Sequence, residues 1–255
     1  MGYNKVIQYG NKTEIYEYQR EPRVVDRRRR PSPKRETNAS NVDLGADGGN
    51  SVSKGKLGKR HDHSRRAKMD FRRLVEANLV GSELPVLITL TCKDIITDLS
   101  YGYKRLRAFN QALRYSYGKS FKYIAVPEFQ KRGAVHFHSL FWGLPEEVVS
   151  QERTTRTIAM KWGMGFVYYK KTDGHIKIAN YLAKYMAKAF TDPRLRNQKS
   201  YVASRNVLRP FISRGTSSLW SLLDELNGEE VLTDEQYYSR YLGNCRHRVF
   251  KGSKE

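Results

Sequence analysis

Two histidines and a glutamate have the spacing of a metal site. His136 and His138 are one residue apart in an apolar run, and residues two apart on a strand leave the same face, about 7 Å from each other. Glu128 precedes His136 by eight residues, so a tight hairpin turning at residues 131–133 would place it opposite His136 on that face. The two imidazoles and the carboxylate would then converge, with open positions for water or substrate. This set suits a divalent ion such as Mg²⁺ or Mn²⁺.

Each of these residues also has an ordinary structural interpretation. Histidines are common on strands without binding metal, and Glu128 could be an exposed carboxylate or a salt-bridge partner. A second pair, His61 and His63, lies in a basic segment with no predicted strand around it. We therefore do not interpret that second pair as a metal site.

A predicted helix at residues 175–190 carries tyrosines among lysines. At about 100° per residue, five polar side chains share about 100° of its circumference: Lys177, Tyr181, Lys184, Tyr185 and Lys188. Tyrosines four residues apart more often pack than react, but here they lie on the cationic side, away from the apolar residues. This arrangement favours contact with phosphate. A phenol has a pKa near 10, and neighbouring ammonium groups are expected to lower that pKa and hold the phosphate to be attacked.

The surrounding elements predict an α+β fold. Alternating and helical apolar patterns indicate strands at residues 86–92, 121–129, 134–142 and 165–170, and helices at 71–79, 99–117, 145–162 and 175–190. Strands that alternate with helices and include one hairpin favour a central antiparallel sheet with flanking helices. Beyond residue 192 the pattern weakens to a strand near 201–208, a helix near 217–226 and an irregular C-terminus.

Charge and composition divide the chain further. The 255 residues include 47 Lys and Arg against 26 Asp and Glu, for a net charge of +21, which implies a polyanionic partner, most often nucleic acid. Residues 1–73 hold 19 basic and 9 acidic residues, with an Arg run at 27–30, and few side chains that could form a core. We predict a disordered basic N-terminal arm at 1–70, a folded domain at 71–215 and a C-terminal extension of uncertain structure at 216–255.

Several classes of protein are disfavoured by what is missing. No apolar run reaches the length of a membrane span, and no secretory signal is recognised at the N-terminus. Two distant cysteines make neither a disulfide framework nor a zinc ribbon and fit a reducing cytosol. The sequence contains no phosphate-binding loop motif of a helicase.

Three of these features in order resemble a known family. Residues 87–91, then Glu128 with residues 136–138, then residues 181–188 are similar to the three motifs of rolling-circle replication initiators of the HUH (His-hydrophobic-His) endonuclease superfamily. The doubled tyrosine is most similar to initiators of small single-stranded DNA phages and bacterial plasmids. The resemblance covers roughly residues 84–210 and implies an HUH endonuclease fold of ferredoxin-like or RRM-like type. It also implies that the predicted domain at 71–215 is a nicking endonuclease domain.

The resemblance implies a role for each matched residue. His136, His138 and Glu128 would bind the metal, and a tyrosine would attack single-stranded origin DNA, leaving a 5′-phosphotyrosine and a free 3′-hydroxyl. Tyr185 ranks above Tyr181 as nucleophile, because related initiators with one tyrosine keep the one after the first lysine. Lys184 and Lys188 would neutralise the developing charge. Expected DNA contacts are Thr89, Thr91, Lys177, Lys131 and Arg132, although the threonines are equally well explained as ordinary strand residues.

The expected function is therefore nicking and rejoining of origin DNA to start rolling-circle replication of a phage or plasmid in the bacterial cytoplasm. The expected partners are a host helicase, a polymerase and a single-strand-binding protein. We expect no membrane partner. A single-strand DNA transposase or a relaxase would use the same chemistry. A basic DNA-binding protein without enzymatic activity is the alternative from another class.

Overall fold

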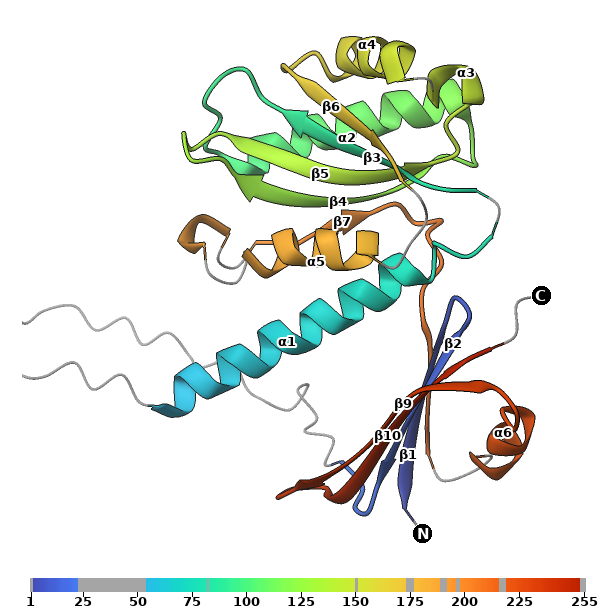
Figure 1. Cartoon of the computed structure of the whole chain (residues 1–255). Helices are drawn as coiled ribbons and strands as arrows, with labels where there is room; N and C mark the ends of the chain where they lie inside the picture. Colours follow the sequence, from blue (N-terminus) through green and yellow to red (C-terminus); the bar gives the residue numbers. More distant parts are fainter. Residues whose placement is uncertain are drawn as a thin grey trace, which may run out of the picture.

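The computed structural model describes residues 2–22, 54–81, 83–149, 151–172, 177–188, 192–195, 198–215 and 219–252. These residues form two five-stranded antiparallel sheets with helices packed on them (Figure 1). The predicted α+β class is thereby confirmed. Its assignment to an HUH, ferredoxin-like or RRM-like fold stays a prediction.

The central sheet is the one that carries the motif residues. Its strand order is β6-β3-β5-β4-β7, and each neighbouring pair is antiparallel. The strands are β3 (Val86–Thr91), β4 (Lys122–Phe129), β5 (Val135–Trp142), β6 (Val167–Lys171) and β7 (Val202–Ala203). Because β3 and β5 are inner strands with apolar residues on both faces, both faces of the sheet must be covered.

Helices form a layer on each side of the central sheet. On one side, α2 (Leu99–Tyr117) and α4 (Gln151–Trp162), which follows the short α3 (Glu146–Val149), bury Phe109, Ile158 and Trp162 against Phe137 and Phe141. On the other side, α5 (Lys177–Lys188) and the C-terminal part of α1 (Lys54–Glu76) pack against β4 and β5. Figure 1 shows α5 between this sheet and α1.

The terminal sheet joins the two ends of the chain. Its order is β8-β1-β2-β10-β9. The strands are β1 (Tyr3–Tyr9), β2 (Lys12–Tyr18), β8 (Phe211–Gly215), β9 (Glu230–Ser239) and β10 (Gly243–Lys251). One face packs on α6 (Leu219–Glu225) through Ile15, Leu219 and Phe250. Strands near opposite ends of the sequence are therefore neighbours.

A buried ion pair connects α1 to the terminal sheet. The guanidinium of Arg73 donates hydrogen bonds to both carboxylate oxygens of Glu14, at 3.1 and 2.5 Å, and Tyr9 donates a third at 2.5 Å. Burial raises the pKa of Glu14, but His247, whose Nε2 lies 3.6 Å from the carboxylate, and the hydrogen bonds from Arg73 and Tyr9 outweigh it and hold the pKa well below its usual range. Glu14 is thus a buried anion stabilised by charged neighbours.

Most of the predicted elements in the middle of the chain are confirmed. The observed strands β3, β4, β5 and β6 and the helices α2, α4, α5 and α6 coincide with predicted segments to within a few residues. The predicted strand near residues 201–208 is reduced to the two-residue β7, and η2 (Pro193–Leu195) is a short 3-10 helix. None of the described helices combines the length and the apolar character needed to cross a membrane.

The prediction of a disordered arm at residues 1–70 is wrong for two segments. Tyr3–Tyr18 forms a hairpin in the terminal sheet, and α1 begins at Lys54 rather than near residue 71. The irregular C-terminus is likewise wrong, because β9 and β10 pair over most of their length. The strands β2 and β10 pair with each other across more than 200 residues of sequence, which local composition does not reveal.

The Arg run at residues 27–30 lies outside the described residues. β8, placed in the predicted 71–215 domain, pairs with β1 of the terminal sheet. As domain limits, the boundaries at residues 70 and 215 stay predictions.

Candidate metal and tyrosine site

The β4–β5 hairpin brings the candidate ligands together. Gly133 has a positive φ of 90° in the turn, and Gln130 N donates to Ala134 O at 2.9 Å to close it. The resulting register pairs Glu128 with His136, as predicted. His138 follows on the same face, while Phe137 between the histidines is fully buried on the other.

The three side chains converge on one point. Nε2 of His136 and Nε2 of His138 lie 2.8 and 2.9 Å from the same carboxylate oxygen, Oε2 of Glu128. All three candidate ligand atoms are within 4.8 Å of one another. The carboxylate is mostly buried and His138 is buried. Two imidazole nitrogens and one carboxylate oxygen on one side of a sheet are a donor set that a divalent metal accepts.

Both imidazole and carboxylate are biased towards the form that binds metal. Burial lowers the pKa of His138, and this outweighs the opposing hydrogen bond to Glu128. Burial alone would raise the pKa of Glu128, but hydrogen bonds from His136, His138 and Lys188 hold it well below the usual range. At neutral pH the site therefore offers a neutral His138 and an ionised Glu128, the protonation states that ligation requires.

A neighbouring strand supports one of the two histidines. β3 pairs Thr89 with His138 and Thr91 with His136. The hydroxyl of Thr89 lies 3.3 Å from Nδ1 of His138, within hydrogen-bond distance. Nδ1 of His136, by contrast, is buried without a hydrogen-bond partner among the described residues. Thr89 can thus orient His138 in the way that outer hydrogen bonds orient metal-binding histidines.

The helix α5 places both tyrosines against His138. The ring of Tyr185 stacks on His138, with 3.6 Å between centroids and 24° between planes. The hydroxyl of Tyr185 donates a hydrogen bond of 3.0 Å to that of Tyr181, whose ring lies edge-on to His138 at 6.3 Å. The opposite side of α5 is buried under β4 and β5 through Ala179, Leu182, Ala183 and Met186. This apolar face determines that the tyrosines point towards the metal-site residues.

The expected lowering of the tyrosine pKa is wrong for Tyr181. Burial and the hydrogen bond with Tyr185 raise the pKa of Tyr181 to about 12, and the positive charge of Lys170 only partly opposes them.

The lysines of α5 divide into two groups. Nζ of Lys188 contacts Oε1 of Glu128 and lies 5.2 Å from the centroid of the Tyr185 ring. Lys184 is exposed and, within the described part of the chain, no contact joins it to the three candidate ligands. Lys177 is the first residue of α5, and its side chain lies outside the described residues. Of the α5 lysines whose side chains are described, Lys188 is the one that contacts the site.

The two cations in the hairpin turn lie at the end of the sheet. Lys131 is exposed. The guanidinium of Arg132 donates hydrogen bonds to the backbone carbonyls of Cys92 and Lys93 and to the side chain of Gln130. Arg132 thus anchors the turn to the end of β3, and its contact with DNA stays a prediction.

Sequence reasoning missed the residues of β6 that share the face of the site. Tyr168 pairs with Thr89 and Lys170 with Leu87. The signal was present in the two-residue alternation of this strand, in which Tyr169 is buried and its neighbours are exposed. Without the order of strands in the sheet, that alternation could not be connected to the histidines.

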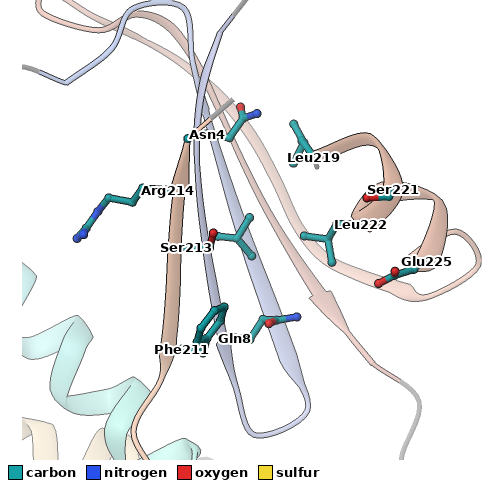
Figure 2. Close-up of a pocket in the computed structure, with 11 residues that line it drawn as sticks. Asn4, Gln8, Phe211, Ser213, Arg214, Leu219, Ser221, Leu222 and Glu225 are labelled. Atoms are coloured by element: carbon teal, nitrogen blue, oxygen red, sulfur yellow. The ribbon is translucent and has the colours of Figure 1, made fainter. Parts of the chain in front are cut away.

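A depression lies on the terminal sheet, apart from these residues. It has a volume of about 350 Å³ and lies between β1, β8 and α6, where Asn4, Gln8, Phe211, Ser213 and Leu222 line it (Figure 2). Its lining contains no histidine or cysteine and a single carboxylate, that of Glu225. The depression is therefore separate from the metal and tyrosine chemistry.

One comparison with known proteins gives a match. The family model of the replication-associated protein ORF2/G2P matches residues 85–190, which is about two-fifths of the chain. No curated protein and no solved structure matches the chain. The matched segment runs from the start of β3 to the end of α5. Over the part that contains every candidate site residue, the chain is therefore similar to replication-associated proteins.

Proposed function

We propose that this protein is a replication initiator that nicks single-stranded origin DNA through a tyrosine and later rejoins it. The observation that carries the proposal is the stacking of Tyr185 on His138, one of the three residues that converge on a candidate metal position. The similarity of residues 85–190 to replication-associated proteins supports a role in starting DNA replication.

The chain's own residues supply a holder for the metal. His136 and His138 would contribute Nε2, and Glu128 would contribute a carboxylate oxygen. Each neutral imidazole would then carry its hydrogen on Nδ1. A bound Mg²⁺ or Mn²⁺ would polarise the scissile phosphate and help to position it. Thr89 would hold the ring of His138 in its binding orientation.

Tyr185 would act as the nucleophile. Its phenolic oxygen would attack the phosphorus, forming a P–O bond to tyrosine while the bond from phosphorus to the 3′ oxygen breaks. The phenol loses its proton in this exchange, and the departing 3′ oxygen gains one. The product is a 5′-phosphotyrosine and a free 3′-hydroxyl from which a polymerase can extend.

Two tyrosines at one site suit repeated cutting and joining. The hydroxyl oxygens of Tyr181 and Tyr185 are 3.0 Å apart, so both can reach one phosphate position. While one tyrosine holds a 5′ end, the other could cut the regenerated origin, and the free 3′-hydroxyl could then attack the first link to rejoin the strand. Lys188, next to Glu128 and Tyr185, is placed to neutralise phosphate charge. Lys184 would act from the exposed side of α5.

The test is a covalent adduct on a labelled stem-loop oligonucleotide from the replicon of this protein. With Mn²⁺, the wild-type chain should form an adduct that survives a denaturing gel, and Tyr185→Phe should reduce it by at least about 100-fold. His136→Ala should abolish the adduct while retaining DNA binding. Tyr181→Phe should still form the first adduct but lose strand transfer between two origins.

Two outcomes would count against the proposal. Absence of any adduct with every stem-loop of the replicon would favour a DNA-binding protein without enzymatic activity. Full activity of Tyr185→Phe together with loss in Tyr181→Phe would reverse the order of the tyrosines. Host helicase, polymerase and single-strand-binding protein, and action in the bacterial cytoplasm, remain part of the proposal.

A further inference from the structure

The edge strand β6 turns three side chains towards the face that holds the candidate site. Strand pairing sets Tyr168 beside Thr89 and Lys170 beside Leu87, and Phe166, just before the strand, accepts a hydrogen bond of 2.8 Å from Thr91 N. Since side chains alternate along a strand, Phe166, Tyr168 and Lys170 share one face. Tyr169, on the other face, is buried in the core with α2 and α4.

The rings of Phe166 and Tyr168 are exposed, and the packing of the edge strand β6 does not account for them. Phe166 is 70% and Tyr168 66% accessible, whereas Tyr169 between them is 6% accessible. Neither Phe166 nor Tyr168 belongs to the hydrophobic clusters of the described residues. Two large rings, about 7 Å apart along the strand, therefore form an aromatic surface that continues the face of the site.

The surface lies close to the proposed chemistry. Tyr168 pairs with Thr89, and Thr89 contacts His138. Two strand spacings separate β6 from β5, which puts Tyr168 roughly 10 Å from His138 at the backbone. This distance is about one to two nucleotides, so a strand whose phosphate lies at the site would bring its neighbouring bases over β6.

The charge near these rings is positive. Lys170 is exposed, and its ammonium is near enough to the Tyr181 phenol to act on it electrostatically. The carboxylate of the site, Glu128, is already paired with Lys188 and the two histidines. A polyanion with flat, unpaired rings would fit both the exposed aromatic side chains and the positive charge beside them. The net charge of the whole chain, +21, is also positive.

We propose that Phe166, Tyr168 and Lys170 form a stacking ledge that binds the unpaired bases next to the scissile phosphate of single-stranded DNA. This inference rests on the proposed nicking function and names how its substrate is held. The rings would stack on bases, and Lys170 would contact the phosphate between them. Bases inside a duplex are already stacked and paired, so the ledge would select single-stranded over double-stranded DNA at the site.

The ledge predicts a specific loss when the rings are removed. In the double variant Phe166→Ala/Tyr168→Ala, the affinity for the single-stranded origin oligonucleotide should fall at least about 10-fold, measured by fluorescence anisotropy in EDTA so that no cleavage occurs. With Mn²⁺, the KM for adduct formation should rise by a similar factor and the maximal rate should change little. A 2-aminopurine placed beside the nick position should be quenched by the wild type and not by the variant.

Two further variants separate stacking from a structural role. Tyr168→Phe keeps the ring and should retain both affinity and quenching. Tyr168→Leu keeps an apolar side chain of similar size without a flat ring and should lose quenching. This comparison remains valid even if the double variant does not fold. Tyr115→Ala, which removes a 94% exposed ring from α2 on the opposite side of the sheet, is the matched control and should bind like the wild type.

Failure of the ledge and failure of the nicking function give different results. If the wild type forms the adduct and the double variant retains affinity, KM and quenching, the ledge is overturned while the function stands. If the wild type forms no adduct, the function fails, and the anisotropy and quenching still decide whether the rings bind DNA. A loss of affinity for duplex and single-stranded DNA alike would also overturn the ledge.

Discussion

At the scale of single residues, the difference between the two histidines has a chemical consequence. His138 has a hydroxyl partner for Nδ1 and a tyrosine ring stacked on it, whereas Nδ1 of His136 lacks a partner among the described atoms. A metal-binding imidazole that is held by a hydrogen bond is more basic and better oriented than one that is not. The orientation of the site should therefore depend on Thr89.

Thr89→Val is expected to weaken metal binding without disturbing the fold. The substitution keeps the shape of the side chain and removes the hydroxyl, so Mn²⁺ affinity measured by calorimetry without DNA should fall about 10-fold to 100-fold. Thr91→Val is the matched comparison, because Thr91 lies on the same strand face and its partner His136 is not hydrogen-bonded to it in the described contacts. Equal Mn²⁺ affinities for the two variants would contradict this role of Thr89.

At the scale of elements, the central sheet positions the site through close backbone contacts. Gly165 lies two residues before β6 with a φ of 146°, and Met164 and Phe166 on either side of it accept hydrogen bonds from Lys93 N and Thr91 N. A Cβ on Gly165 would come within 2.4 Å of the backbone nitrogen of Lys93. Only glycine allows β6 to join β3 in this way.

Gly165→Ala is therefore expected to destabilise the protein. The cost should be about 1 to 3 kcal/mol or more in the free energy of unfolding, since both backbone strain and a steric clash are introduced. Gly118→Ala, at the end of α2, is a suitable control because its φ is 81° but no atom lies within 4 Å of the added Cβ. Urea denaturation should show the larger loss for Gly165→Ala, and equal losses would argue against the clash.

The elements that could be predicted are those whose pattern is local in the sequence. The β4–β5 hairpin and α5 are local patterns: an eight-residue separation across a turn, and an apolar stripe on one helix. The hairpin at Tyr3–Tyr18 also alternates, but a composition dominated by nearby arginines obscured it. Helix α1 was predicted at less than half its length because its N-terminal half carries no apolar stripe of its own.

At the scale of the whole molecule, α1 joins the two sheets. Phe71 and Leu74 pack in the cluster beneath α5, while Arg73 between them pairs with Glu14 of the terminal sheet. Breaking a buried pair by removing one charge leaves the other uncompensated. The position of the terminal sheet relative to the candidate site thus depends on this pair.

Stability should fall in acid because of Glu14. Its folded pKa is held below the unfolded value, so its contribution is present above about pH 4.3 and is lost as the pH falls towards the folded pKa. Glu14→Gln should cost about 3 to 5 kcal/mol at pH 7 and should show a smaller further loss between pH 6 and pH 3 than the wild type, measured by denaturant unfolding. Glu230→Gln, which removes an exposed partner of Lys251, should behave like the wild type at both pH values.

The sequence by itself determined the pairing of Glu128 with His136, the common face of the two histidines and the separation of apolar and tyrosine faces on α5. These follow from strand and helix periods and from one short turn, which depend on neighbours within about ten residues. The order of strands, and therefore the place of Tyr168 beside Thr89, was decided only by the tertiary structure. So were the choice of Lys188 over Lys184 at the carboxylate and the pairing of β2 with β10. Each of these depends on contacts between distant segments, whose energy no local pattern of residues encodes.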